Sequence, residues 1–320
     1  MVVENNIQKE VGGVANGNEM ILDRRAMLSM AVAGLAGSMV ACASAPHAPA
    51  AMKEAGQLRR RFEGKAVVIT GATSGIGRAA ALQFAAEGAK VSFCGRREKL
   101  GREVENEIKI RGGEAHYIHA DVRNETEVKA FVDQAVQLYG PPNVAFNNAG
   151  ITLERPLHEY SSQDWDDVVS TNLRGVFLAL KYEIPYMLAN GGGNIVVTSS
   201  SNAIATTEKR SAYSASKRGL VGLVQSAALD YAAKGIRINA LIPGTTDTAL
   251  VRRAAGMEDA PDAAWETAAR LWAKSHVPGL ERMATPEEIA TFALALASGD
   301  FPYMTGSQMV IDGGKTAHAG

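Results

Sequence analysis

Short apolar runs alternate with amphipathic stretches from about residue 62 onward. Runs such as Ala66–Thr70 are typical of buried strands, whereas residues 75–87 carry apolar positions at helical spacing. Further strands are expected at 89–94, 116–120, 144–146, 194–198, 236–242 and 308–311, and further helices at 97–110, 125–139, 163–189, 212–234 and from Pro286. This alternation predicts an α/β domain in which helices cover both faces of a parallel sheet of about seven strands.

The remaining segments suggest how the chain is divided. Residues 62–320 form the expected single domain, and residues 44–61 are interpreted as a linker before it. Residues 249–281 interrupt the alternation of strands and helices, and we expect them to form a lid over the substrate-binding site. Trp265 and Trp272 in this insert fit a lid, and they fit equally well packing against a neighbouring subunit.

Residues 1–43 have the layout of an export signal. The pair Arg24-Arg25 precedes an uncharged run of 17 residues, Met27–Ala43, which ends in small residues before Pro46. Paired arginines are typical of a bacterial twin-arginine signal, so we expect recognition by export machinery and a periplasmic or otherwise exported protein. A lipid anchor at Cys42, a membrane anchor, or a disordered extension on a cytoplasmic protein are the alternatives, although a span needs about 20 residues.

Composition narrows the classes of function. The chain has 33 Lys and Arg against 34 Asp and Glu, so no strong basic field favours nucleic acid as a partner. Its two cysteines exclude a disulfide scaffold, and its six histidines show no pair at metal-ligand spacing. We therefore expect no nucleic acid and no metal.

A glycine-rich loop joins the first strand to the first helix. Gly71 permits a tight turn, Gly75 lets the backbone approach a pyrophosphate, and Gly77 allows close packing of helix on strand. The helix N-terminus then offers free N–H groups to phosphate. The loop predicts a dinucleotide site.

The residues after the second and third strands bear on the choice of dinucleotide. An acidic residue after the second strand would select NAD, but this chain has Gly95-Arg96-Arg97. Arg96 can pair with a 2′-phosphate, so NADP is the preferred cofactor and NAD the alternative; both arginines also fit solvated positions. Asp121 fits a bond to the adenine amine or the N-cap of a helix.

Tyr213 and Lys217 are four residues apart on a predicted helix and share one face. A phenol with a pKa of about 10 needs roughly 4 kcal/mol of phenolate stabilisation to titrate near pH 7. An ammonium about 4 Å away supplies a similar amount at an effective dielectric constant near 20. This spacing is common by chance, and a surface pair is the simple alternative.

Several motifs together resemble the short-chain dehydrogenase/reductase family. Thr70–Gly77, Asn147-Asn148-Ala149-Gly150, Ser200, Tyr213-x3-Lys217 and Pro243-Gly244 occur in the family's order and spacing, and Asp312-Gly313-Gly314 closes the domain. The resemblance covers about residues 62–315. It implies a single Rossmann-like, doubly wound sheet of strand order 3-2-1-4-5-6-7.

The resemblance also implies roles for individual residues. Tyr213 would be the general acid/base, Lys217 would lower its pKa and hold the nicotinamide ribose, and Ser200 would orient the reacting oxygen. Asn172 would hold a water in the proton relay, or simply mark a helix kink. The other positions implied to contact the cofactor are Thr73, Ser74, Ile76, Asp121, Val122, Asn148, Ala149, Gly150, Pro243, Gly244, Thr246 and Thr248.

The implied reaction is hydride transfer between a nicotinamide and a ketone or secondary alcohol. A non-redox enzyme or a cofactor-binding sensor on the same scaffold is the alternative. The substrate would be a small molecule that the sequence does not name, and a homo-oligomer, tetramer or dimer, is expected by resemblance. Lys209 and Arg210 are interpreted as solvated surface charges, and attraction of an acidic substrate is the alternative.

Overall fold

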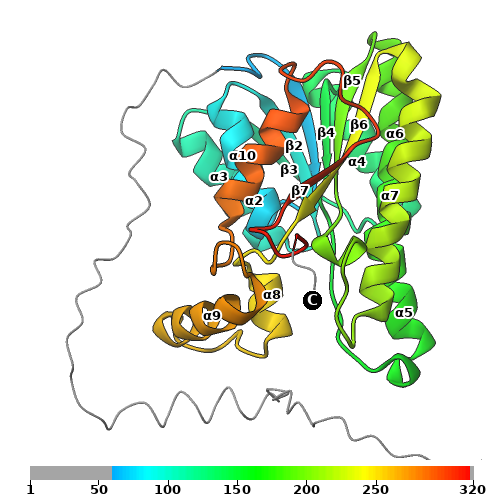
Figure 1. The fold of residues 1–320 in the computed structure, drawn as a ribbon. Helices are drawn as coiled ribbons and strands as arrows, with labels where there is room; N and C mark the ends of the chain where they lie inside the picture. The colour runs from blue at the N-terminus through cyan, green and yellow to red at the C-terminus, as the bar shows by residue number, and fades with distance from the viewer. Residues whose placement is uncertain (1–59, 318–320) are drawn as a thin grey trace, which may run out of the picture. The chain divides into compact units, whose positions relative to one another are not determined.

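A parallel seven-stranded sheet forms the centre of the domain (Figure 1). The computed structural model describes residues 60–317, so the expected export signal and most of the linker lie outside the described residues. The strand order is β3-β2-β1-β4-β5-β6-β7, which confirms the expected topology. The strands are β1 (Ala66–Thr70), β2 (Lys90–Gly95), β3 (Glu114–His119), β4 (Val144–Asn147), β5 (Gly193–Thr198), β6 (Ile236–Pro243) and β7 (Gln308–Ile311).

Helices cover both faces of this sheet. Residues from α2 (Gly75–Ala86), α3 (Glu98–Ile110) and α10 (Pro286–Ala297) build one apolar core. Those from α4 (Glu125–Tyr139), α6 (Gly175–Ala189) and α7 (Ser211–Tyr231) build the other (Figure 1).

The strands are apolar because both of their faces are buried. Every residue of β1 is buried, with Val67 and Ile69 in the first core and Val68 in the second. This period-2 alternation between two apolar cores explains why residues 66–69 are apolar, whereas the hydroxyl of Thr70 at the end of the strand accepts from the Asn148 amide.

Parallel pairing brings the strand ends of the site to one edge. Thr70 pairs with Asn147, and Thr198 with Leu241, so the segments after β1, β4, β5 and β6 emerge side by side. The order reverses between β1 and β4, and ligands of open α/β sheets bind at such a switch point.

Two expected elements differ in detail. The expected helix 163–189 consists of α5 (Ser162–Val169) and α6, joined by a π-helical turn at Ser170–Arg174. The insert contains α8 (Ala249–Ala254) and α9 (Asp262–His276).

No helix within residues 60–317 has both the length and the apolar character to cross a bilayer. The same residues contain no cluster of three potential metal ligands.

Candidate active site

The glycine loop is closely packed, and a Cβ atom would clash at Gly71 and Gly77 and be tightly placed at Gly75. Gly71 has φ of 72°, and its Cβ would lie 2.6 Å from the Ala149 Cα. A Cβ on Gly77 would lie 2.4 Å from the Gly71 carbonyl oxygen, and one on Gly75 would lie 3.1 Å from Thr248 Cγ2. Ser74, the N-cap of α2, makes no side-chain capping bond. The first N–H groups of α2 therefore lack that partner, which fits a site for pyrophosphate.

The segment Asn148–Gly150 binds the loop to the neighbouring strands. The Asn148 and Ala149 amides donate to Thr70 Oγ1 over 3.1 and 3.3 Å. Asn148 Nδ2 donates to the Gly71 carbonyl, and Asn148 Oδ1 accepts from Thr198 Oγ1. Ile76 lies at the start of α2 and packs against the first core. These bonds hold the glycine loop against the ends of β4 and β5.

Arg97, rather than Arg96, contacts the glycine loop. Its guanidinium donates to Thr73 Oγ1 over 2.8 Å and to Ser74 Oγ over 2.5 Å. Burial, and then the positive charges of Arg253 and Arg96, lower the pKa of Arg97. Arg96 instead lies 3.7 Å from Asp121 and is half exposed. The sequence showed both arginines, but adjacent residues of extended backbone point to opposite sides, so only the structure distinguishes them.

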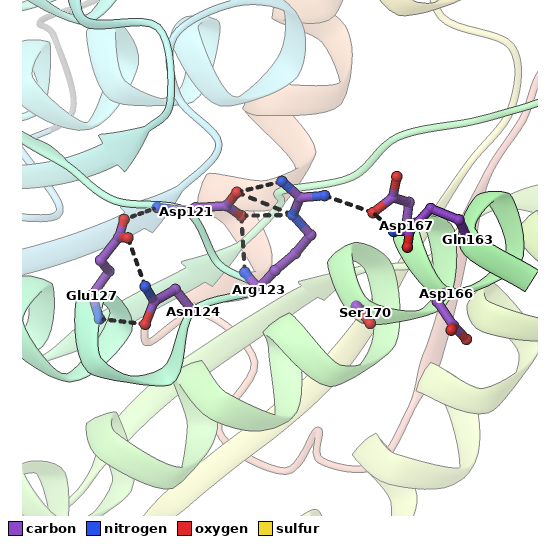
Figure 2. A pocket seen from close by; sticks show the side chains of 8 residues that line it. All are labelled: Asp121, Arg123, Asn124, Glu127, Gln163, Asp166, Asp167 and Ser170. Atoms are coloured by element: carbon purple, nitrogen blue, oxygen red, sulfur yellow. Dashed lines mark hydrogen bonds and ion pairs between the residues drawn. The ribbon is translucent and has the colours of Figure 1, made fainter.

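Asp121 is held by an arginine rather than placed at a helix N-cap (Figure 2). Arg123 donates to Asp121 Oδ2 over 2.7 Å and to Asp167 Oδ1 over 2.7 Å. Burial raises the pKa of Asp121, but the bonds from Arg123 outweigh it and the pKa is lowered. The N-cap interpretation is wrong because Asn124 caps α4.

A polar pocket opens around this ion pair, between the start of α4 and α5 (Figure 2). Its lining residues are Asp121, Arg123, Asn124, Glu127, Gln163, Asp166, Asp167 and Ser170. Val122 is buried instead, and a Cβ on Gly175 of α6 would lie 2.9 Å from Val122 Cγ2. The side chains of Asp121 and Val122 therefore lie in different environments, one in the polar pocket and one in the core.

Tyr213 and Lys217 lie in the first two turns of α7, as their spacing predicts. Lys217 Nζ donates to the Thr198 carbonyl over 2.8 Å and lies 5.8 Å from the centre of the Tyr213 ring. Burial lowers the pKa of Lys217 to about 8. Burial also raises the pKa of Tyr213, although a bond to Ser200 and the charge of Arg210 act to lower it. The expected lowering of the Tyr213 pKa is therefore not produced by these protein groups alone.

Ser200 is distinguished from its two neighbours by its contacts. Ser199 Oγ donates to the Lys217 carbonyl, so it is committed to holding α7. Ser200 Oγ accepts from the Asn202 amide over 3.2 Å, and Ser200 is also one of the groups that act to lower the pKa of Tyr213. Ser201 is buried at 2% exposure. The hydrogen bond of Ser199 thus makes it the least available of the three hydroxyls, and the choice of Ser200 over Ser201 stays a prediction from the motif spacing.

Asn172 lies in the π-helical turn, which agrees with its interpretation as a kink residue. Its Oδ1 accepts from the Ile151 amide over 2.8 Å, and its Nδ2 donates to the Ile151 carbonyl and to Ser216. A Cβ on Gly150 would lie 3.3 Å from Asn172 Oδ1 and 3.4 Å from Lys217 Nζ. Glycine at position 150 thus keeps open the space between these two side chains. Such π-turns are frequent at functional sites.

The segment after β6 connects the sheet to the insert. A Cβ on Gly244 would lie 2.6 Å from the Asp312 Cα, so Pro243-Gly244 packs against the end of β7. Thr246 is buried and forms a β-bridge with Ala284, and Thr248 caps α8.

Trp265 of α9 is buried, and its Nε1 donates to Asp247 Oδ1 over 2.8 Å. Trp265 therefore packs within its own chain, and the alternative of a neighbouring subunit is wrong for this residue. The bond also holds the insert against the segment after β6.

Comparison with known proteins agrees with this geometry. Residues 71–316 match a family model described as enoyl-(acyl carrier protein) reductase. The chain is 41% identical to an uncharacterized oxidoreductase of Bacillus subtilis, over 81% of this chain and 93% of that protein. It is 38% identical to cyclohexanol dehydrogenase of an Acinetobacter species, over 81% and 98%. The crystal structure of levodione reductase superposes with a TM-score of 0.75 at 34% identity, over 81% and 100%.

Three findings point to one class of enzyme. The family model matches most of the chain, the relatives are similar enough to be homologous, and the glycine loop is packed too closely for larger side chains. The chain belongs to the short-chain dehydrogenase/reductase family and is an NAD(P)-dependent oxidoreductase that transfers hydride between a nicotinamide and the carbinol or carbonyl carbon of its substrate.

Proposed function

We propose that Tyr213 exchanges the proton with the substrate oxygen, that Ser200 orients that oxygen, and that Lys217 supplies the neighbouring positive charge. The bound nicotinamide supplies or accepts the hydride. The observation that carries the proposal is the arrangement at the start of α7, where the buried Lys217 ammonium lies 5.8 Å from the centre of the Tyr213 ring and donates to the Thr198 carbonyl, two residues before Ser200. Asn172 holds the adjoining turn in place through its bonds to Ile151.

Replacing the phenol hydroxyl tests this assignment. Tyr213→Phe removes the proton donor while keeping the ring, so we expect loss of turnover by about 100-fold or more with little change in coenzyme affinity. Ketone reduction and alcohol oxidation are followed by nicotinamide absorbance, and coenzyme binding by fluorescence titration. Tyr231→Phe, on the last turn of the same helix, is the matched control and keeps its activity. Substantial turnover in Tyr213→Phe contradicts the mechanism.

We infer that NADP is the preferred coenzyme. Support comes from the arginines after β2. Arg97 lies against the glycine loop, the charges of Arg96 and Arg253 lower its pKa, and it forms no ion pair with a carboxylate of residues 60–317. A 2′-phosphate would relieve this repulsion among guanidinium groups. Arg97→Ala should lower the NADP-to-NAD ratio of kcat/KM by about 10-fold or more, whereas Arg102→Ala, further along α3, should leave it unchanged. An unchanged ratio in Arg97→Ala contradicts the inference.

We propose that the enzyme is a homo-oligomer, a tetramer or a dimer. The edge strand β7 supports this, because Val310 remains 42% exposed and the preceding loop exposes Phe301 and Tyr303. An exposed sheet edge with large apolar side chains is suited to pairing with a second copy. Light scattering coupled to size-exclusion chromatography measures the mass, and a monomer at micromolar concentration contradicts the proposal.

We propose that residues 1–43 direct twin-arginine export, so that the enzyme acts in the periplasm. The proposal is supported by the Arg24-Arg25 pair and the uncharged run that follows it. Fractionation of cells expressing a tagged chain should find a shortened protein in the periplasm. Arg24→Lys with Arg25→Lys should retain the full-length chain in the cytoplasm. Equal distribution of both chains contradicts the proposal, and membrane-bound protein indicates the lipid anchor at Cys42 instead.

A further inference from the structure

A lysine lies at the carboxyl edge of the sheet beside the proposed reaction site. Lys315 follows β7 and the turn Asp312-Gly313-Gly314, and β7 pairs with β6 in parallel. Its Nζ donates to Thr245 Oγ1 over 3.2 Å, in the segment after β6 that also contains Thr246 and Thr248. The ammonium also lies 5.5 Å from the centre of the Trp272 ring of α9. Lys315 is therefore held between the sheet edge and the insert.

No carboxylate neutralises this lysine within residues 60–317. Asp312, whose charge reaches Lys315, is already engaged. Its Oδ1 accepts from the Gly314 amide, and its Oδ2 accepts from the Thr316 amide and hydroxyl. A half-buried ammonium group without an anionic partner is costly, so this arrangement suits a site that binds an anion from outside.

Arg210 connects this lysine to Tyr213. Arg210 precedes α7 by one residue, and it forms an ion pair with Glu154 that leaves both side chains less than one-third exposed. The expectation that Arg210 is a solvated surface charge is therefore wrong. Arg210 lies three residues before Tyr213 in the sequence, and its charge acts to lower the pKa of both Tyr213 and Lys315. Glu154 already pairs with the Arg210 guanidinium, whereas Lys315 forms no ion pair with any carboxylate of the described residues 60–317.

We propose that Lys315 binds a carboxylate of the substrate, so that the enzyme acts on an oxo acid or hydroxy acid whose reacting carbon faces Tyr213. The proposal rests on the proposed role of Tyr213. Thr245 and Trp272 position the ammonium. A carboxylate there would satisfy the lysine by a charge-assisted bond.

The experiment compares free acids with their neutral esters. Straight-chain oxo acids that differ in the separation of ketone and carboxylate are offered beside their methyl esters, and kcat/KM is measured by nicotinamide absorbance. We expect the wild-type enzyme to favour at least one acid over its ester, because a charge-assisted bond is worth about 10- to 100-fold. Lys315→Met should reduce this acid-to-ester ratio by a similar factor, and Lys315→Arg should largely preserve it.

Lys274→Met is the matched control, because it removes an exposed lysine from the same insert. Its acid-to-ester ratio should equal that of the wild-type enzyme. A wild-type preference for every ester, or an unchanged ratio in Lys315→Met, overturns the proposal. Weaker coenzyme binding in Lys315→Met with an unchanged ratio also overturns it, since the anion would then be a coenzyme phosphate. Failure to reduce any ketone with either coenzyme refutes the proposed function instead.

Discussion

A buried acid–amide pair beneath the active site should make folding stability depend on pH. Glu183 of α6 is 0% exposed, and its Oε2 accepts from Asn147 Nδ2 over 2.8 Å. Glu183 Oε1 and Asn147 Oδ1 are both buried without a partner. If Glu183 is ionised, both of these oxygens are acceptors and neither has a donor. One proton on Glu183 would supply the missing donor, because the acid could then donate to Asn147 Oδ1. Glu183 is therefore a neutral acid at mildly acidic pH.

Its pKa sets the size of the effect. Burial raises the pKa of Glu183 from 4.5 to about 7, against the opposing bond from Asn147. A difference of that size between folded and unfolded chains corresponds to about 3 kcal/mol of unfolding free energy. Because the pKa is raised in the folded chain, ionisation is penalised there. The cost is zero below about pH 4.5, grows as the pH rises, and is complete above about pH 7.

The substitution Glu183→Gln isolates the free-energy cost of ionising Glu183 in the folded chain. The glutamine amide can donate to Asn147 and accept from it without ever ionising, so it mimics the protonated acid. The two proteins should have similar stability near pH 4.5, and the variant should become more stable than wild type by about 3 kcal/mol near pH 8. Urea unfolding followed by tryptophan fluorescence, at one protein concentration across this range, measures the difference.

Glu105 provides a control of opposite sign. It is 4% exposed, and although burial raises its pKa, bonds from Lys109 and Arg102 outweigh burial and lower it. Glu105→Gln should therefore cost stability at neutral pH, and the cost should shrink as the pH falls. If the difference between wild type and Glu183→Gln is the same at every pH while Glu105→Gln behaves as expected, Glu183 is not protonated in the folded chain and the reasoning is refuted.

Three further substitutions test the geometry of the site. Gly77→Ala places a Cβ 2.4 Å from the Gly71 carbonyl, so it should cost about 1–3 kcal/mol by urea unfolding and weaken coenzyme binding in a fluorescence titration. Trp265→Phe removes the bond to Asp247, so KM for the substrate should rise roughly 3- to 10-fold in steady-state assays while coenzyme affinity is kept. Asn172→Ala removes three hydrogen bonds around the π-turn and should lower the unfolding free energy by about 1–3 kcal/mol; an unchanged midpoint contradicts its positioning role.

The hydrophobic pattern and the motifs along the chain were sufficient to predict the fold class, the glycine loop and the pairing of Tyr213 with Lys217. Strands buried on both faces must be apolar throughout, and helices between parallel strands must be amphipathic, so both are readable locally. The glycine loop was equally readable, because it requires positive φ at Gly71 and Gly75 and a close approach of backbone at Gly77. Tyr213 and Lys217 could be paired because helical spacing alone places them on one face.

The partners of charged side chains could be decided only by tertiary structure. Asp121 pairs with Arg123, Arg97 rather than Arg96 reaches the glycine loop, and these choices depend on side-chain direction at strand ends. Glu183 has no local signal of its burial, because its partner is 36 residues away. Lys315 and Thr245 are 70 residues apart and meet only because β6 and β7 are adjacent. Local sequence determines backbone preference and periodicity, whereas burial and charge pairing arise from contacts that the fold brings together.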